Sequence, residues 1–159
     1  MDSEVKLYLQ RAENEIILAK TDFEISLSEE LKNILKIAKE KTFFNDVISH
    51  SYYSIFYTAK ACLLSKGIKT EPPEEHKKTY EEFKKIVDSG ELDRQLIEIY
   101  EKEAEKAEIL LMIFFREKRK RGRIVYNVNA NSNMPYAKES VDNARKFVSI
   151  IKSILEKNE

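Results

Sequence analysis

Glycine and proline are scarce in this chain, with three of each among 159 residues. Both residues interrupt regular helices, so their scarcity predicts long helices joined by few turns. A chain of this length can bury one hydrophobic core and suits one domain. We therefore expect an all-α protein in which residues 1–159 form a single helical domain.

Apolar residues recur at three- and four-residue steps, the spacing of amphipathic helices, in five segments. These segments are 4–24, 44–66, 74–87, 92–120 and 134–157. The segment 44–66 is apolar nearly all round and is predicted to be the central helix. Short connections between such helices predict an up-and-down antiparallel bundle of about five helices.

Two further segments are less regular. Residues 28–41 have a short helical pattern that begins after Ser28, a plausible N-cap. The pattern leaves open whether this segment packs on the core or is a mobile excursion. Residues 122–133 contain Gly122 and several asparagines, so they are predicted to be a loop, with Asn133 as a candidate N-cap of the last helix.

Charge is balanced overall but unevenly distributed. Lys and Arg number 28, as do Asp and Glu, which argues against a strongly basic nucleic-acid-binding protein. Residues 109–123 nevertheless carry a basic cluster opposed by one acidic residue, Glu117. The cluster comprises Arg116, Lys118, Arg119, Lys120, Arg121 and Arg123.

This cluster has two interpretations. Cations near a helix C-terminus stabilise the negative end of the helix dipole, and such a run is often only a solvated face. Six cations beside a polar loop also suit the phosphates of RNA or of a nucleotide. Tyr126 and Asn127 follow directly and could stack on a base or bond to it.

Motifs for other chemistry are missing from the sequence. The two histidines, His50 and His76, lie in different predicted helices and no zinc-site spacing is present, so we expect no metal. Cys62 lies on the apolar central helix and is predicted to be a buried hydrophobe. No P-loop, GxGxxG or GxSxG motif occurs, so we expect no cofactor.

The expected location is the cytoplasm. One cysteine fits a reducing compartment, and the charged N-terminus lacks the apolar core of a signal peptide. No long uncharged apolar run is present, so we expect no membrane span.

The histidines and the aromatic residues of segment 44–66 also have structural interpretations. His50 is predicted to bond to a neighbouring side chain. His76 is either an exposed residue in the first turn of a helix or part of a binding site. The aromatic residues Tyr52, Tyr53, Phe56 and Tyr57 are interpreted as core and dimer contacts rather than as a stacking platform.

Three features together resemble small prokaryotic single-domain members of the HEPN family (higher eukaryote and prokaryote nucleotide-binding). The first is the pattern of paired tyrosines, Phe and A-K-A-x-L-L-x-x-G, which ends at Gly67. The second is His76 at the start of the next helix. The third is a basic segment ending in Tyr126. The sequences concerned are FFNDVISHSYYSIFYTAKACLLSKGI and RKRGRIVY, and the resemblance spans about residues 4–155.

The resemblance implies an all-α bundle that forms a homodimer. Many HEPN proteins are metal-independent endoribonucleases, and many act as the toxin beside a nucleotidyltransferase antitoxin. Their signature is Arg-x4–6-His, in which the Arg holds the scissile phosphate and the His transfers protons at the 2′-hydroxyl.

This chain departs from that signature. Arg121 has the matching spacing, but Tyr126 stands where the His would be, and a phenol is a poor proton carrier at neutral pH. The leading hypothesis is therefore a non-catalytic or weakly catalytic HEPN-like protein that binds a nucleotide, RNA or a nucleotidyltransferase partner. Its binding residues are predicted to be Arg116, Arg119, Lys120, Arg121, Arg123, Tyr126 and His76.

Two alternatives remain. One is a metal-independent endoribonuclease that uses Arg121 with Tyr126 or His76 as proton carrier. The other is a structural adaptor whose basic helix end binds an acidic protein.

Overall fold

The computed structural model describes residues 2–99, 107–124 and 133–157, and these form an all-α bundle. The predicted fold class is confirmed. The described residues contain seven helices: α1 (Ser3–Leu27), α2 (Glu29–Ile34), α3 (Phe44–Ser65), α4 (Glu75–Asp88), α5 (Glu91–Ile99), α6 (Ala107–Ile124) and α7 (Met134–Lys157).

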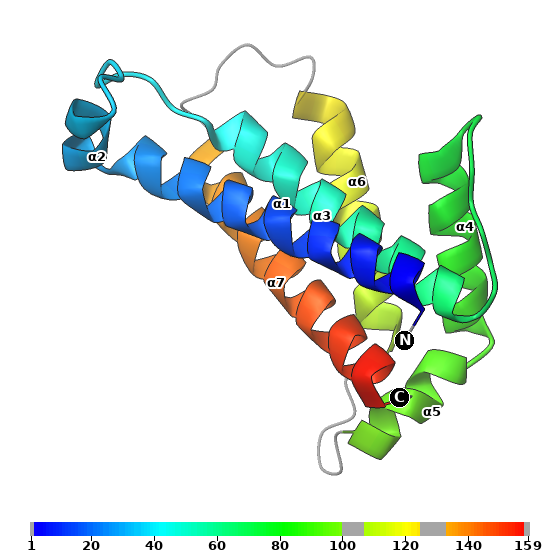
Figure 1. The fold of residues 1–159 in the computed structure, drawn as a ribbon. Coiled ribbons are helices and arrows are strands. Elements are labelled where there is room, and N and C mark those ends of the chain that lie inside the picture. The colour runs from blue at the N-terminus through cyan, green and yellow to red at the C-terminus, as the bar shows by residue number, and fades with distance from the viewer. Residues whose placement is uncertain (1, 100–106, 125–132, 158–159) are drawn as a thin grey trace.

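Helix α3 is the centre of the bundle, as its apolar sequence predicts. It packs against α1, α4, α6 and α7, and Figure 1 shows these helices around it. The four helices α1, α3, α6 and α7 alternate in direction along the chain (Figure 1). Because α3 is covered on several sides, residues on different faces of it reach both the core and the site described below.

Three phenylalanines from three helices form the middle of the core. Phe83 of α4, Phe114 of α6 and Phe147 of α7 are completely buried. Their ring centroids lie 5.4–6.0 Å apart in tilted or edge-to-face arrangements, the geometry that aromatic pairs prefer. These ring contacts fix how α6 packs against α4 and α7.

The prediction of one continuous helix over 92–120 is wrong. The backbone N–H of Ala107 donates to the Asp93 carboxylate at 2.7 Å. In a continuous helix these residues would lie about 21 Å apart along the axis. The reversal has a packing reason, because it lets Leu96 of α5 and Leu110 of α6 enter the same buried cluster.

The segment 28–41 packs at the end of α1. Ser28 caps α2 as predicted, since its hydroxyl accepts from the N–H of Leu31 at 3.1 Å. Lys32 is buried and its ammonium donates to the carbonyl of Lys39 at 2.8 Å. The helix α2 packs against α1 and lies beyond the start of α3 in Figure 1.

The predicted loop 122–133 begins later than expected. Residues Gly122 to Ile124 form the last turn of α6, so the C-terminal half of the basic cluster is helical. The side-chain amide of Asn133, the candidate N-cap, donates to Asn45 Oδ1 at 2.6 Å and connects the start of α7 to α3. None of the helices in the described residues has both the length and the apolar character needed to cross a membrane.

Candidate nucleic-acid interface

The basic cluster is divided between two faces of α6. Successive residues of a helix are turned by about 100°. Arg116, Arg119, Lys120 and Arg123 therefore share one face, which borders α7. Arg121 lies on a different face and points toward α3. The surroundings of these two faces differ.

Arg121 is held against the tyrosine pair of α3. Its guanidinium donates to the Tyr53 hydroxyl at 2.6 Å. The same group lies 4.9 Å from the centroid of the Tyr53 ring and 5.5 Å from that of Tyr52, which is within the range of cation–π attraction. Arg121 is only half-buried, so it keeps access to solvent while its position is fixed.

His76 is in contact with the same tyrosine pair. It lies in the first turn of α4 and its Nδ1 is 2.8 Å from the Tyr52 hydroxyl. Its ring stacks on Phe56 with centroids 4.1 Å apart, and it meets Tyr53 edge-on. The interpretation of His76 as a simply exposed residue is wrong, since the side chain is half-buried among these rings.

Burial lowers the pKa of His76, and the neighbouring charge of Arg121 lowers it further. The imidazole is therefore neutral at pH 7 and can accept a proton. Burial also raises the pKa of Tyr52 well above that of a free phenol, so its hydroxyl stays protonated. We refer to Arg121, His76, Tyr52, Tyr53 and Phe56 as the Arg121–His76 cluster.

An ion pair fixes the start of α4 at this place. Glu75, next to His76, pairs with the nearly buried ammonium of Lys60 from α3. Lys60 in turn lies 4.8 Å from the centroid of the Tyr8 ring of α1. The position of His76 relative to α3 thus depends on contacts from three helices.

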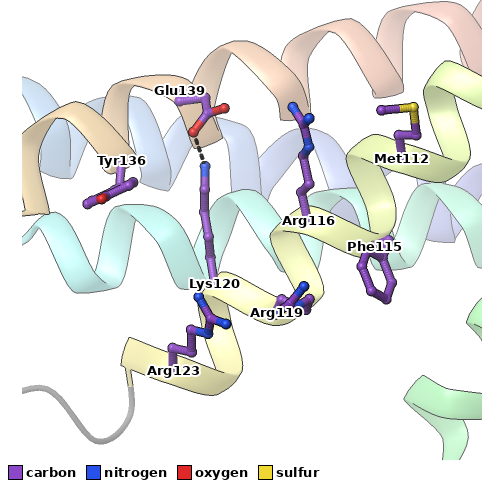
Figure 2. Close-up of a pocket in the computed structure, with 8 residues that line it drawn as sticks. All are labelled: Met112, Phe115, Arg116, Arg119, Lys120, Arg123, Tyr136 and Glu139. Atoms are coloured by element: carbon purple, nitrogen blue, oxygen red, sulfur yellow. Dashed lines mark hydrogen bonds and ion pairs between the residues drawn. The ribbon is translucent and has the colours of Figure 1, made fainter.

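The other face of α6 borders a hollow of about 380 Å³. The lining residues of this α6–α7 hollow are Met112, Phe115, Arg116, Arg119, Lys120, Arg123, Tyr136 and Glu139. Figure 2 shows Arg116 and Lys120 reaching from α6 toward α7, while Phe115 points away from α7 and Arg119 lies beside it. Arg116, Arg119 and Arg123 are exposed, and within the described part of the chain no carboxylate pairs with them.

Lys120 differs from these arginines because its charge is already compensated. Its ammonium lies 3.0 Å from Oε1 of Glu117 and 2.6 Å from Oε2 of Glu139 on α7. Glu117 is fully buried and also accepts from Asn143 at 2.9 Å. These contacts connect α6 to α7 at the floor of the hollow.

The structure therefore brings together some predicted site residues and separates others. Arg121 and His76 meet at the tyrosine pair. Lys118 lies against Tyr80 of α4, and the other four cations line the hollow. Tyr126 and Asn127 lie outside the described residues. The sequence led us to interpret Tyr52 and Tyr53 as core and dimer contacts, and it did not single out Phe115 or Tyr136. The signal available for the last two was an aromatic residue on the polar side of a helix beside cations.

The remaining candidates are structural. His50 bonds to a neighbour as predicted, with its Nδ1 2.6 Å from Glu15 of α1. Cys62 is completely buried, and burial raises its pKa to about 12, so the thiol is unreactive at neutral pH. Among the described residues, no group of three or more histidine, cysteine or acidic side chains is arranged to hold a metal ion.

Comparison of the chain with models of known protein families and with curated proteins finds no match.

Proposed function

We propose that this chain is a HEPN-like protein that binds RNA through the phosphates. The observation that carries the proposal is the row of three exposed arginines on one face of α6. Arg116, Arg119 and Arg123 lie one helical turn apart and open onto the α6–α7 hollow. Guanidinium groups are well suited to phosphate oxygens, which they can bind with two hydrogen bonds.

The environment of these arginines supports binding rather than a structural role. A cation that serves only the fold is usually compensated, as Lys120 is by Glu117 and Glu139. The three arginines have no such carboxylate among the described residues, so a phosphate can approach them without displacing a partner. We assign Lys120 to holding α6 on α7.

The test compares two triple variants in a fluorescence anisotropy titration of labelled RNA at several salt concentrations. Arg116→Gln/Arg119→Gln/Arg123→Gln is expected to weaken binding and to reduce the slope of log K against log salt by about 2, since three phosphate contacts are lost. Lys77→Gln/Lys84→Gln/Lys85→Gln removes the same charge from α4 and is expected to bind like the parent. Equal losses of RNA affinity in both variants would show that only the net charge of the protein matters, and this would contradict the proposal.

A second candidate function is metal-independent RNA cleavage at the Arg121–His76 cluster. The observation in its favour is that both residues contact the same two tyrosines, although Arg-x4–6-His is absent from the sequence. In this mechanism Arg121 holds the phosphate, and neutral His76 takes the proton of the 2′-hydroxyl as its oxygen attacks phosphorus. The P–O5′ bond breaks as the P–O2′ bond forms, which leaves a 2′,3′-cyclic phosphate and a 5′-oxygen that takes a proton from water. This role requires the tautomer in which Nδ1–H donates to the Tyr52 oxygen, because Nε2 then carries no proton and can accept one from the substrate.

The cleavage test uses end-labelled RNA in EDTA. The parent is expected to give fragments ending in 2′,3′-cyclic phosphate, and both His76→Ala and Arg121→Ala are expected to give none. Arg145→Ala on α7 is the matched control. Cleavage that survives in His76→Ala would show a contaminating nuclease or a different proton carrier.

The resemblance further implies a homodimer and a nucleotidyltransferase partner, and both stay proposals. Light scattering of the purified protein tests the first. Co-purification with a nucleotidyltransferase encoded beside this chain tests the second.

A further inference from the structure

Two aromatic rings lie exposed beside the arginines of the α6–α7 hollow. Phe115 of α6 is 43% exposed and Tyr136 of α7 is 56% exposed. Met112, one turn before Phe115, is 47% exposed. Exposed apolar side chains grouped around one hollow indicate a binding site, in which a bound ligand covers them.

The Phe115 ring is held in place by neighbouring side chains. Tyr80 of α4 lies against it with ring centroids 6.0 Å apart, and Tyr80 itself is in cation–π contact with Lys118 at 5.0 Å. Arg119 lies 5.5 Å from the centroid of the Phe115 ring. A ring held in this way keeps its orientation, so stacking on it costs little conformational entropy.

Tyr136 supplies a ring on the other side of the arginines. It belongs to the first turn of α7 and, in Figure 2, lies across the hollow from Phe115, beyond Lys120 and Arg123. Cations flanked by aromatic rings are the combination by which proteins hold unpaired nucleic acid, since the cations follow the backbone and the rings stack on bases. A duplex keeps its bases stacked on each other and offers the rings no partner.

We propose that the α6–α7 hollow binds single-stranded RNA, with bases stacked on Phe115 and Tyr136 and phosphates on Arg116, Arg119 and Arg123. This inference rests on the proposed function and adds the strandedness of the RNA and the residues that recognise it. The stacking site lies on a different face of α6 from Arg121, so it does not depend on whether the Arg121–His76 cluster cleaves RNA.

The test uses three probes of equal length: a single-stranded RNA, the same sequence in a duplex, and a single strand in which abasic sites replace most bases. The parent is expected to bind the first probe most tightly. Phe115→Leu and Tyr136→Leu are each expected to weaken that binding about tenfold, and to leave binding of the abasic strand unchanged. Phe115→Tyr, which keeps a stacking ring, is expected to bind like the parent.

The outcomes separate this inference from the proposed function. Loss of binding in the triple arginine variant, with no effect of Phe115→Leu or Tyr136→Leu, would overturn base stacking and leave phosphate binding intact. Equal affinity of the parent for the single strand and the duplex would also overturn it. Failure of the parent to bind any of the three probes would overturn the proposed function itself. Leu7→Ala, an exposed apolar residue of α1, is the control for general surface effects.

Discussion

The Tyr52 hydroxyl lies 2.8 Å from Nδ1 of His76, so one hydrogen bond joins a core residue of α3 to the first turn of α4. Tyr52 is 1% exposed and stacks on Phe56, which in turn stacks on His76. The protonation state of His76 is thereby coupled to the packing of α3 and α4, and the first two predictions follow from this coupling.

Stability is expected to fall as the pH is lowered through the range in which His76 takes up a proton. The pKa of His76 is lower in the folded chain than the ordinary value near 6.5, because of burial and then Arg121. Its contribution is therefore fully present above about 6.5 and is lost as the pH falls through the folded-state pKa. Urea midpoints at pH 7.5 and pH 5 are expected to differ more for the parent than for His76→Gln. An equal difference in both would contradict the coupling.

Removing the charge of Arg121 is expected to raise the pKa of His76. Among the cations that oppose protonation of this imidazole, Arg121 has a larger effect than Lys118 or Lys60. The chain has two histidines, so a proton NMR titration follows two C2–H signals, with His50 as the internal reference. Arg121→Gln is expected to move the His76 titration upward, and Arg123→Gln, on the other face of α6, is expected to leave it in place. The same upward shift in both variants would point to a general charge effect.

Lys120→Met is expected to destabilise the protein by about 3 kcal/mol. Its loss leaves the fully buried carboxylate of Glu117 without its cation, and an uncompensated buried charge is costly. Lys152→Met is the control, because Lys152 and Glu13 form an exposed ion pair whose loss costs about 1 kcal/mol or less. Both values come from urea denaturation. If Lys120→Met cost no more than Lys152→Met, Glu117 would not depend on Lys120.

Ser26→Ala is expected to loosen the junction between α1 and α3. The Ser26 hydroxyl donates to the carbonyl of Asp22 and accepts from the N–H of Phe43 at 2.8 Å. Loss of such a bond costs about 1 kcal/mol, which corresponds to about fivefold faster hydrogen exchange at the Phe43 amide. Ser153→Ala removes an exposed hydroxyl on α7 and is expected to leave that amide unchanged. Unchanged exchange in Ser26→Ala would show that the amide is protected by other contacts.

Apolar spacing was sufficient to predict the all-α class and the central position of α3, because helical periodicity and burial are local properties of the sequence. The same reasoning failed between α5 and α6. Residues 92–120 continue one helical pattern without a helix-breaking residue. The break between α5 and α6 is explained only by the packing of Leu96 and Leu110 into one core. Such packing is a property of the tertiary structure, and the periodicity of the sequence does not show it.

The sequence predicted the basic residues of the candidate site but not how they are arranged in space. The basic residues were recognisable as a cluster, yet their division between two faces depended on whether 116–123 is helical, and Gly122 argued for a loop. The meeting of His76 with Arg121 could not be predicted, since it requires α4 to pack beside α6 on the tyrosine pair. Phe115 and Tyr136 became notable only once their exposure was known.

Helix α3 contributes to the core and supplies the aromatic rings of the Arg121–His76 cluster, whereas the α6–α7 hollow is lined mostly by exposed side chains. Under the proposed RNA binding, a genetic screen for loss of RNA retention is expected to recover two kinds of allele. Changes at Tyr52 or Phe56 would appear mainly as insoluble protein, because they remove buried rings. Changes at Arg116, Arg119 or Arg123 are expected to leave soluble protein at normal abundance, because these side chains are exposed. The sequence of the hollow can therefore vary without loss of the fold.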